Sequence, residues 1–428
     1  MRHLLYIILA TTLCLGSCGG KQTGEDTEGL DSDSIVDLAI DTLMAGRLES
    51  LVSHKVRMTD EQLSLSVYDL TAQQPIYAFR EQTLVPPASC LKLLTAVAAL
   101  KYMGMNYEYH NRLSIKGDVQ HGILYGSVIL QAEDDPLFES FEGFAQAIKG
   151  ADIRHIEGDI VFDLARTDTL KAHASAKSWD IPYNKLPVLL KGEERVKREF
   201  MAQLTAQGIK FKQNPIFAAH DIAAHEAESS PLRRRLAIDM AQCGSTVLAE
   251  ESHRLTDVIT PMLLHSSNIK ADALIWHLNH VYGRLYEENP LHAFMKYELD
   301  TDYADSPLVI NDGSGLSPDN RLTTDFLICL LRYAYEQKPI FRYLIGEALP
   351  TPAAGERCGT LDVRMANTPC VGKVFCKTGT LVTIGGSGLA GYAKGSNHHW
   401  YAFAILNIDM PVADAREFQD KLCRELVR

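Results

Sequence analysis

The sequence predicts an α+β fold, in which an antiparallel sheet is flanked by helices and a smaller α+β domain is inserted. The first observation is three β-rich runs near the end of the chain, separated by Gly-rich or polar turns: VFCKTGTLVTI, GSGLAGYAKG and WYAFAILNID. The second is an alternating segment at 63–70, which the turn TAQQ joins to a return strand at 75–81. The third is a strand–helix–strand pattern that begins near residue 113. A strand meander between helices is typical of an α+β arrangement.

The chain opens on a segment that is typical of exported proteins. Residues 1–17 have a basic start, an apolar run and small residues before Cys18, which is the pattern of a signal peptide. The apolar run is too short for a comfortable membrane span. The segment LGSC that ends at Cys18 resembles the lipobox of bacterial lipoproteins, in which acyl chains on the cysteine anchor the mature protein. The alternative is an ordinary signal peptide with an incidental Cys18.

The segments after the signal peptide are expected to form a tether, a helix and a hairpin in turn. Residues 18–34 are acidic and lack apolar periodicity, which predicts a flexible tether. Residues 35–52 repeat apolar side chains at helical spacing. After the 63–81 hairpin, PPASCLKLLTAVAAL predicts a buried helix that begins near Ser89.

The inserted domain is expected at 113–239. Within it, GILYGSVILQA and IRHIEGDIVFD are strand patterns, with the helical pattern FESFEGFAQAIKG between them. Residues 164–235 are more polar and less regular, and helical patterns resume from about Met240. ADAREFQDKLCRELVR predicts a closing helix. The main domain is therefore expected to be discontinuous, over 35–112 and 240–428.

Composition restricts the class of partner. The 428 residues are 46% hydrophobic and 22% charged, which is usual for a folded protein of two or three domains. A formal net charge of −12 argues against nucleic acid as the main partner, because phosphate binding favours a basic face. The chain has no H-E-x-x-H motif, and we expect neither a metal nor a cofactor.

The cysteines do not form a recognisable framework. Of the nine, Cys14 lies in the signal peptide and Cys18 at the lipobox. The others show neither dense spacing nor a C-x-x-C metal pattern, and most are interpreted as buried free thiols: Cys90, Cys243, Cys329, Cys358, Cys370, Cys376 and Cys423. A single disulfide remains open.

Ser89 and Lys92 are candidates for a nucleophile and its base. Positions i and i+3 share one face of a helix, and Ser–Lys pairs are a known form of hydroxyl activation. The lysine pKa must fall from about 10.4 to roughly 7–8, a shift that costs about 4 kcal/mol. Apolar surroundings and a second cation produce such a shift. Alone the motif is weak, because S-x-x-K recurs at Ser267 and Lys270.

Two further motifs follow in order. Ser266-Ser267-Asn268 precedes a helical pattern, and Lys377-Thr378-Gly379 lies on a predicted strand. The order S-x-x-K, S-x-N and K-T-G is the signature of penicillin-binding proteins and class A β-lactamases. Together with INDGSGLSPDNRLT and CGTLDVRM, these motifs resemble the penicillin-binding protein 4 family of D-alanyl-D-alanine carboxypeptidases and endopeptidases, over roughly residues 35–428.

The resemblance implies a penicillin-binding protein/serine β-lactamase-like transpeptidase fold and a serine DD-peptidase that trims peptidoglycan stem peptides. In that family Ser89 would attack the penultimate D-Ala carbonyl and Lys92 would take its proton. Ser266 would relay a proton to the leaving amine, and Asn268 would orient the substrate amide and Lys92. Penicillins would acylate Ser89 as covalent inhibitors.

The K-T-G strand would bind the substrate. The resemblance implies that Lys377 keeps Lys92 neutral by its charge and that Thr378 binds the terminal carboxylate. Gly379 would let the substrate approach the strand edge, and the backbone N–H groups of Ser89 and Thr380 would form the oxyanion hole.

Three positions depart from the family pattern or stay ambiguous. Ser267 stands where the family usually has Asp, which should alter a local contact and keep the chemistry. The family's G-D-P segment is here AEDDP, and Asp135 is either a contact for the stem peptide's amino group or a loop acid. Arg364 is either a substrate contact or part of a structural ion pair.

Two other functions are alternatives. A class A β-lactamase needs a deacylating Glu, but Ile275 occupies one matching position and His292 disrupts the other candidate segment. A catalytically idle penicillin- or wall-binding lipoprotein has no positive support, because every motif side chain is present. The expected partners are peptidoglycan stems, β-lactams and, through the anchor, a membrane facing the periplasm. The sequence does not separate carboxypeptidase from endopeptidase action, and it leaves open the stem diamino acid, the oligomeric state and the membrane leaflet.

Overall fold

The computed structural model of the chain describes residues 42–177, 180–212, 216–218, 244–281, 289–299, 307–353 and 355–428. The predicted signal peptide, Cys18, the tether and Cys243 lie outside these ranges. Within them, no helix is both long and apolar enough to cross a membrane.

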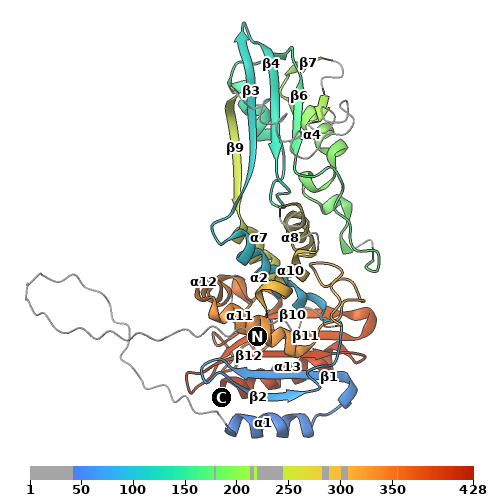
Figure 1. Cartoon of the computed structure of the whole chain (residues 1–428), viewed down its shortest axis with the longest axis vertical. Helices are drawn as coiled ribbons and strands as arrows, with labels where there is room; N and C mark the ends of the chain where they lie inside the picture. The colour runs from blue at the N-terminus through green and yellow to red at the C-terminus, as the bar shows by residue number, and fades with distance from the viewer. Residues whose placement is uncertain are drawn as a thin grey trace, which may run out of the picture. The chain divides into compact units, whose positions relative to one another are not determined.

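One sheet of the described chain has five strands in the order β10-β11-β12-β1-β2, and the strand pairs are antiparallel. Strands from the two ends of the sequence therefore lie side by side, blue beside red in Figure 1. The hairpin and the late meander predicted from the sequence are both present. The strands are β1 (Leu63–Asp69), β2 (Gln74–Phe79), β10 (Val374–Leu381), β11 (Gly386–Lys394) and β12 (Trp400–Asn407).

Helices cover both faces of this sheet because its strands alternate. Tyr401 and Phe403 of β12 join the apolar cluster of α1 (Thr42–Ser53) and α13 (Val412–Val427). Ala402 and Ala404, which point the other way, join the cluster of α2 (Lys92–Met103) and α11 (Thr324–Glu336). The prediction of an antiparallel sheet flanked by helices is confirmed.

The apolar cluster of α2 and α11 continues into further helices, which carry part of the candidate site. It contains side chains of α2 together with Val258, Leu274 and Phe294. Further bounds are α7 (Leu255–Leu264), α8 (Asn268–Val281), α10 (Pro290–Glu298) and α12 (Lys338–Tyr343).

A second sheet has seven strands, of which β4 pairs with β5 and β6 in parallel and with β3 antiparallel. Its own apolar core includes Phe162 and Phe200, and α3 (Glu142–Gly150) and α4 (Glu193–Ala206) pack into it. The strands are β3 (Glu108–Gln120), β4 (Ile123–Ala132), β5 (His155–Ile156), β6 (Ile160–Leu164), β7 (Lys210–Phe211), β8 (Ile216–Ala218) and β9 (Thr246–Arg254).

The strand β9 shows where the sequence interpretation was wrong. Helical patterns were expected from about Met240, but Thr246–Arg254 pairs antiparallel with β3. The β9 side chains are all exposed or half-buried, so the strand lacks the apolar alternation that marks a buried face. Its pairing brings Arg254 opposite Glu108, and the Leu255 N–H donates to the Tyr107 carbonyl at 2.9 Å.

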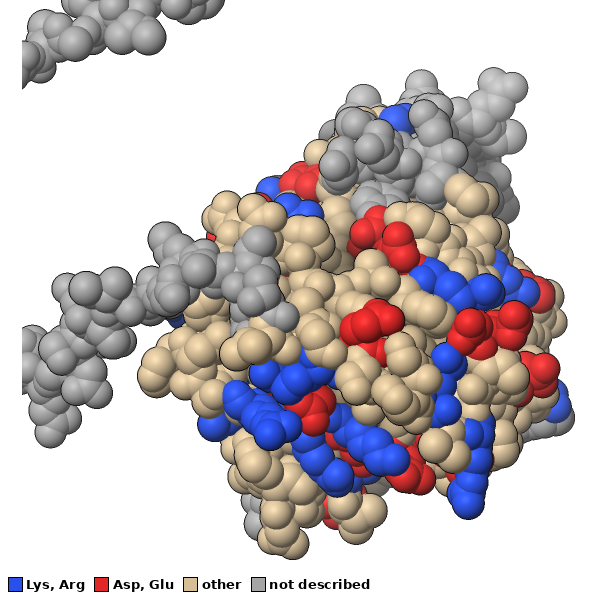
Figure 2. Space-filling view, turned by 90° about the horizontal axis from the view of Figure 1, so that it is seen from below, with Lys and Arg blue, Asp and Glu red and all other residues tan. Residues whose placement is uncertain are grey.

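The face seen from below in Figure 2 carries basic and acidic side chains close together. Two ion pairs lie near α1 and α13: Arg57 lies 3.4 Å from Asp414, and Lys421 lies 2.7 Å from Glu417. The charge on this face is therefore interspersed.

Candidate active site

Ser89 lies in a 3-10 turn, Ala88–Leu91, that leads directly into α2. Ala88 in this turn has φ +49°, a left-handed conformation that an alanine rarely adopts. Lys92 is the first residue of α2 and is fully buried, whereas Ser89 is half-buried. The predicted helix start and the i, i+3 relation are thus present.

Lys92 joins three segments of the site. Its Nζ donates to Ser89 Oγ at 2.9 Å, to Asn268 Oδ1 at 2.8 Å and to the Ser314 carbonyl. Two of these partners, the amide oxygen and the carbonyl, can only accept a hydrogen bond. Ser89 Oγ is the one partner that can give a proton to Lys92.

The buried lysines have lowered pKa values. Burial, together with the charge of Lys377, lowers the pKa of Lys92 to about 7, against the opposing effect of the carboxyls of Asp272 and Asp312. Burial also lowers the pKa of Lys377, to about 8. The shift that a base function requires of Lys92 is therefore present in this environment.

The S-S-N motif lies between α7 and α8. Asn268 begins α8, and Ser267 Oγ accepts from the Lys270 N–H at 3.4 Å, as a helix N-cap does. Ser267 thus supplies a cap where the family usually has Asp. Ser266 has φ +58°, a strained conformation for serine that often accompanies functional sites.

The K-T-G motif lies on β10. Lys377 is fully buried, and its Nζ donates to the Thr378 carbonyl at 2.8 Å. Thr378 Oγ1 donates to Thr360 Oγ1 at 2.7 Å. A Cβ on Gly379 would lie 3.0 Å from the Pro87 carbonyl and 3.2 Å from Ser89 N, so glycine permits the strand to pass beside the nucleophile turn.

A loop that sequence reasoning treated only as part of the family resemblance completes the surroundings of Lys92. Asp312 accepts from the N–H groups of Gly315 and Ser317, both at 2.7 Å. Asp272 of α8 accepts from the Gly313 N–H at 3.0 Å. These carboxylates hold the loop so that the Ser314 carbonyl faces Lys92; the DGSG motif is the only sequence signal for it.

Arg416 is another residue that the sequence did not indicate. It is exposed on α13, and its Nη2 donates to Thr380 Oγ1 at 3.2 Å. Among the described residues, no carboxylate oxygen lies within 4.0 Å of its guanidinium nitrogens. A helical arginine so far along the chain carries no motif, which explains why it was missed.

Asp135 does not join this group of residues. It is fully buried, and its carboxylate accepts from Asn111 Nδ2 at 2.8 Å and from the Leu137 N–H at 2.9 Å. His253 Nδ1 lies 2.7 Å from the same carboxylate. These contacts give Asp135 a structural role, and its contact with the stem peptide's amino group stays a prediction.

The contacts of Arg364 and of the cysteines are structural. Arg364 contacts Asp420 through Nε at 2.9 Å and Nη2 at 2.6 Å, which is the structural ion pair. Cys90 is fully buried, with Sγ 3.5 Å from the Lys377 carbonyl, as expected for packing. The cysteines of the described ranges are free thiols: Cys90, Cys329, Cys358, Cys370, Cys376 and Cys423. No group of three or more metal-ligating side chains occurs there.

A buried lysine beside a serine at a helix start, in a fold whose sheet is flanked by helices, is the arrangement of serine hydrolases that work through an acyl-enzyme. The chain belongs to the D-Ala-D-Ala carboxypeptidase 3 (S13) family, whose profile matches residues 44–185 and 233–426. A D-alanyl-D-alanine carboxypeptidase of Actinomadura sp. (strain R39) is 38% identical over 104 residues, which are 23% of this chain and 18% of that protein.

Solved structures agree in fold. Penicillin binding protein 4 from Haemophilus influenzae superposes with a TM-score of 0.68 at 16% identity, covering 89% of this chain and 99% of that one. The same protein complexed with a β-lactam gives a TM-score of 0.66 at 19% identity, with the same coverage of both chains.

Proposed function

We propose that this chain is a serine-type D-Ala-D-Ala carboxypeptidase or DD-endopeptidase, which trims peptidoglycan stem peptides through a Ser89 acyl-enzyme. The observation that carries the proposal is the contact between Lys92 Nζ and Ser89 Oγ at 2.9 Å, in a buried environment that lowers the lysine pKa. Membership of the S13 family supports the same reaction.

In this mechanism a neutral Lys92 keeps its two N–H bonds on Asn268 Oδ1 and the Ser314 carbonyl. Its lone pair then faces Ser89 Oγ and takes the hydroxyl proton as the oxygen attacks the carbonyl of the penultimate D-Ala. The C–N bond breaks, and Ser266 passes a proton to the leaving amine. Water hydrolyses the resulting ester.

The strand β10 would bind the other end of the substrate. The N–H groups of Ser89 and Thr380 stabilise the oxyanion, and Thr378 and Lys377 face the terminal carboxylate. Lys377 loses part of its charge near pH 8, so a permanent cation that contacts the same strand has a role. Arg416, at hydrogen-bond distance from Thr380, supplies that cation for the carboxylate.

Export and anchorage complete the proposal. The sequence of residues 1–18 supports a lipoprotein signal with acylated Cys18, residues 18–34 a tether, and a peptidoglycan substrate requires a location outside the cytoplasm. The parts predicted at 35–112 and 240–428 would form the catalytic domain, and the inserted domain predicted at 113–239 would extend to Glu108 and Arg254, because β3 and β9 belong to the second sheet.

Covalent labelling by a fluorescent penicillin tests the proposal. Wild type should label stoichiometrically, Ser89→Ala should not label, and Cys90→Ala, which changes the neighbouring residue, should still label. Label on Ser89→Ala would show that the nucleophile lies elsewhere. Ile275 is buried against the Gly313 loop, so we expect the adduct to hydrolyse slowly; rapid turnover of penicillin would favour the β-lactamase alternative.

Purified muropeptides separate the two peptidase activities. Mass spectrometry distinguishes the loss of one D-Ala from a stem from the scission of cross-linked dimers. If neither product forms while penicillin still labels Ser89, the chain is a penicillin-binding protein without DD-peptidase activity.

A further inference from the structure

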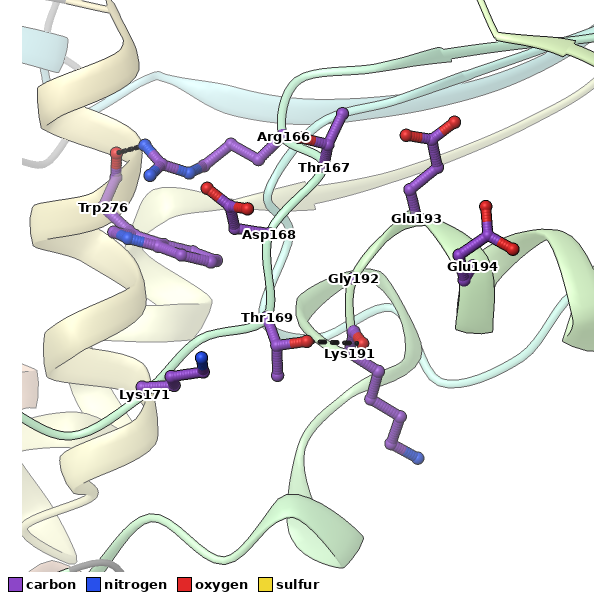
Figure 3. Close-up of a pocket in the computed structure, with 10 residues that line it drawn as sticks. All are labelled: Arg166, Thr167, Asp168, Thr169, Lys171, Lys191, Gly192, Glu193, Glu194 and Trp276. Atoms are coloured by element: carbon purple, nitrogen blue, oxygen red, sulfur yellow. Dashed lines mark hydrogen bonds between the residues drawn. The ribbon is translucent and has the colours of Figure 1, made fainter.

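A cavity of about 660 Å³ lies beside α8, and none of the site residues described above line it. Figure 3 shows its walls: the segment 166–171 after β6, the segment 191–194 at the start of α4, and Trp276 of α8. The cavity thus adjoins the helix whose first residue, Asn268, contacts Lys92.

The walls are held in place without a ligand. The Arg166 guanidinium lies 4.0 Å from the centre of the Trp276 ring, and its Nη1 lies 3.5 Å from the Trp276 carbonyl. Thr169 Oγ1 donates to the Lys191 carbonyl at 2.9 Å and joins two walls (Figure 3). Trp276 also packs on a small apolar cluster that includes Leu190. Side chains fixed in this way lose little entropy when a ligand binds.

The unpaired charge of the walls is mainly positive. Glu193 and Glu194 lie 2.6 Å and 3.4 Å from the same cation, Lys197, which offsets one of their two charges. Among the described residues, no carboxylate oxygen lies within 4.0 Å of the charged nitrogens of the wall cations Arg166, Lys171 and Lys191. Asp168 is the remaining acid of the walls. The three wall cations therefore outnumber the two negative charges that remain on the wall acids, which favours a ligand with more carboxylates than ammonium groups.

The cavity lies within reach of the Ser89 site along the chain's own elements. Trp276 follows Asn268 by two helical turns, about 12 Å along the axis of α8. That length is spanned by roughly four extended peptide residues. On the other side, Ser175, shortly after Lys171, shares a hydrogen bond with Ser317 of the loop that Asp312 holds.

We propose that this cavity binds the carboxylate-bearing part of one peptidoglycan stem peptide, while Ser89 acts on a D-Ala bond elsewhere in the same peptidoglycan. The inference rests on the proposed function for its ligand. Peptidoglycan stems carry several carboxylates and an amino group, and Arg166 and Lys171 are the cations that would bind the former. Polymeric substrate would then be held more tightly than a short D-Ala-D-Ala peptide.

Direct binding tests this without relying on catalysis. The probe is an isolated stem tripeptide that lacks D-Ala-D-Ala, titrated calorimetrically into Ser89→Ala protein. Replacing Arg166 and Lys171 by Gln should raise Kd by about tenfold or more, as expected for lost charge-assisted hydrogen bonds. The control is Lys116→Gln with Lys210→Gln, which removes two exposed charges from β3 and β7 of the second sheet and should leave Kd unchanged. The proposal would be overturned if the tripeptide did not bind the Ser89→Ala protein, or if both double variants lost affinity equally.

A kinetic measurement uses cross-linked dimers that keep the terminal D-Ala carboxylate free and carry their other stem carboxylates either free or amidated. Wild type should show a lower KM for the free form, and Arg166→Gln with Lys171→Gln should abolish that difference. Penicillin acylation and cleavage of a short D-Ala-D-Ala peptide should stay unchanged, which shows that the Ser89 site is intact. A difference between free and amidated dimers that persists in the variant would refute the proposal. Failure of labelling and short-peptide cleavage in wild type would refute the proposed function instead.

Discussion

Arg416 Nη2 lies 3.2 Å from Thr380 Oγ1, so a cation from the C-terminal helix reaches the strand that carries Lys377 and Thr378. A guanidinium remains charged at every relevant pH, unlike a buried lysine. The contact therefore joins a permanent positive charge to a strand whose own lysine titrates.

Arg416→Gln should weaken recognition of the substrate's terminal carboxylate. We expect KM to rise about tenfold for a D-Ala-D-Ala peptide and the acylation rate to fall similarly for a penicillin with a free carboxylate. Esterified or amidated counterparts should react equally with both proteins. Arg424→Gln, an exposed change on the same helix, is the control. An equal effect on charged and uncharged substrates would remove Arg416 from carboxylate binding.

The rate of penicillin acylation should depend on pH in a bell shape. Lys92 must be neutral, and its pKa is lowered to about 7, so the rate should rise as pH increases through 7. Lys377 must be charged, and its pKa is lowered to about 8, so the rate should fall above that pH. Stopped-flow acylation between about pH 5 and pH 10 measures both limbs. In Lys377→Ala the acid limb should move to higher pH, because the charge of Lys377 helps to lower the pKa of Lys92. A flat profile in wild type would contradict the base function.

Asn268→Asp should move the acid limb to higher pH. The change places a carboxylate 2.8 Å from Lys92 Nζ, and an opposite charge stabilises the ammonium form and raises its pKa. At pH 7 acylation should slow by at least tenfold and recover in part at higher pH. Asn268→Ala removes the acceptor without adding charge and should slow acylation at every pH. A lower rate with no displacement of the acid limb in Asn268→Asp would argue against Lys92 as the base.

Asp135→Ala should reduce stability and leave substrate selection unchanged. The carboxylate is buried and contacts the buried Asn111, the half-buried His253 and the Leu137 N–H, so its loss removes a partner from each of them. We expect a loss of about 3 kcal/mol in the free energy of unfolding, measured with denaturant. Asp118→Ala, an exposed change on β3, is the control. A changed preference for stems with a free amino group, at unchanged stability, would restore Asp135 to the substrate site.

The sequence predicted those features that leave a local pattern. Strand alternation at 63–70, the late meander and the order of the three motifs each have a signature within a few residues. The Ser314 carbonyl lies in the DGSG motif, but the motif does not reveal its contact, because every residue has a carbonyl and only the folded loop aims this one at Lys92. Arg416 likewise acquires its role from the packing of α13 against β10. The strand β9 was missed because it is recognised by its partner β3, and not by an apolar face of its own.

The pairing of Glu108 with Arg254 has a consequence for how the main sheet assembles. The chain enters the second sheet through β3 and leaves it through β9, and these paired strands lie only about 5 Å apart. The segment between α2 and α7 is closed at its base by the pairing of β3 with β9. Once these strands have paired, a longer segment adds little to the entropy cost of bringing α2 and α7 together. The segment between α2 and α7 can therefore become longer or shorter or change its loops during evolution, while the geometry between Lys92 and Asn268 is kept.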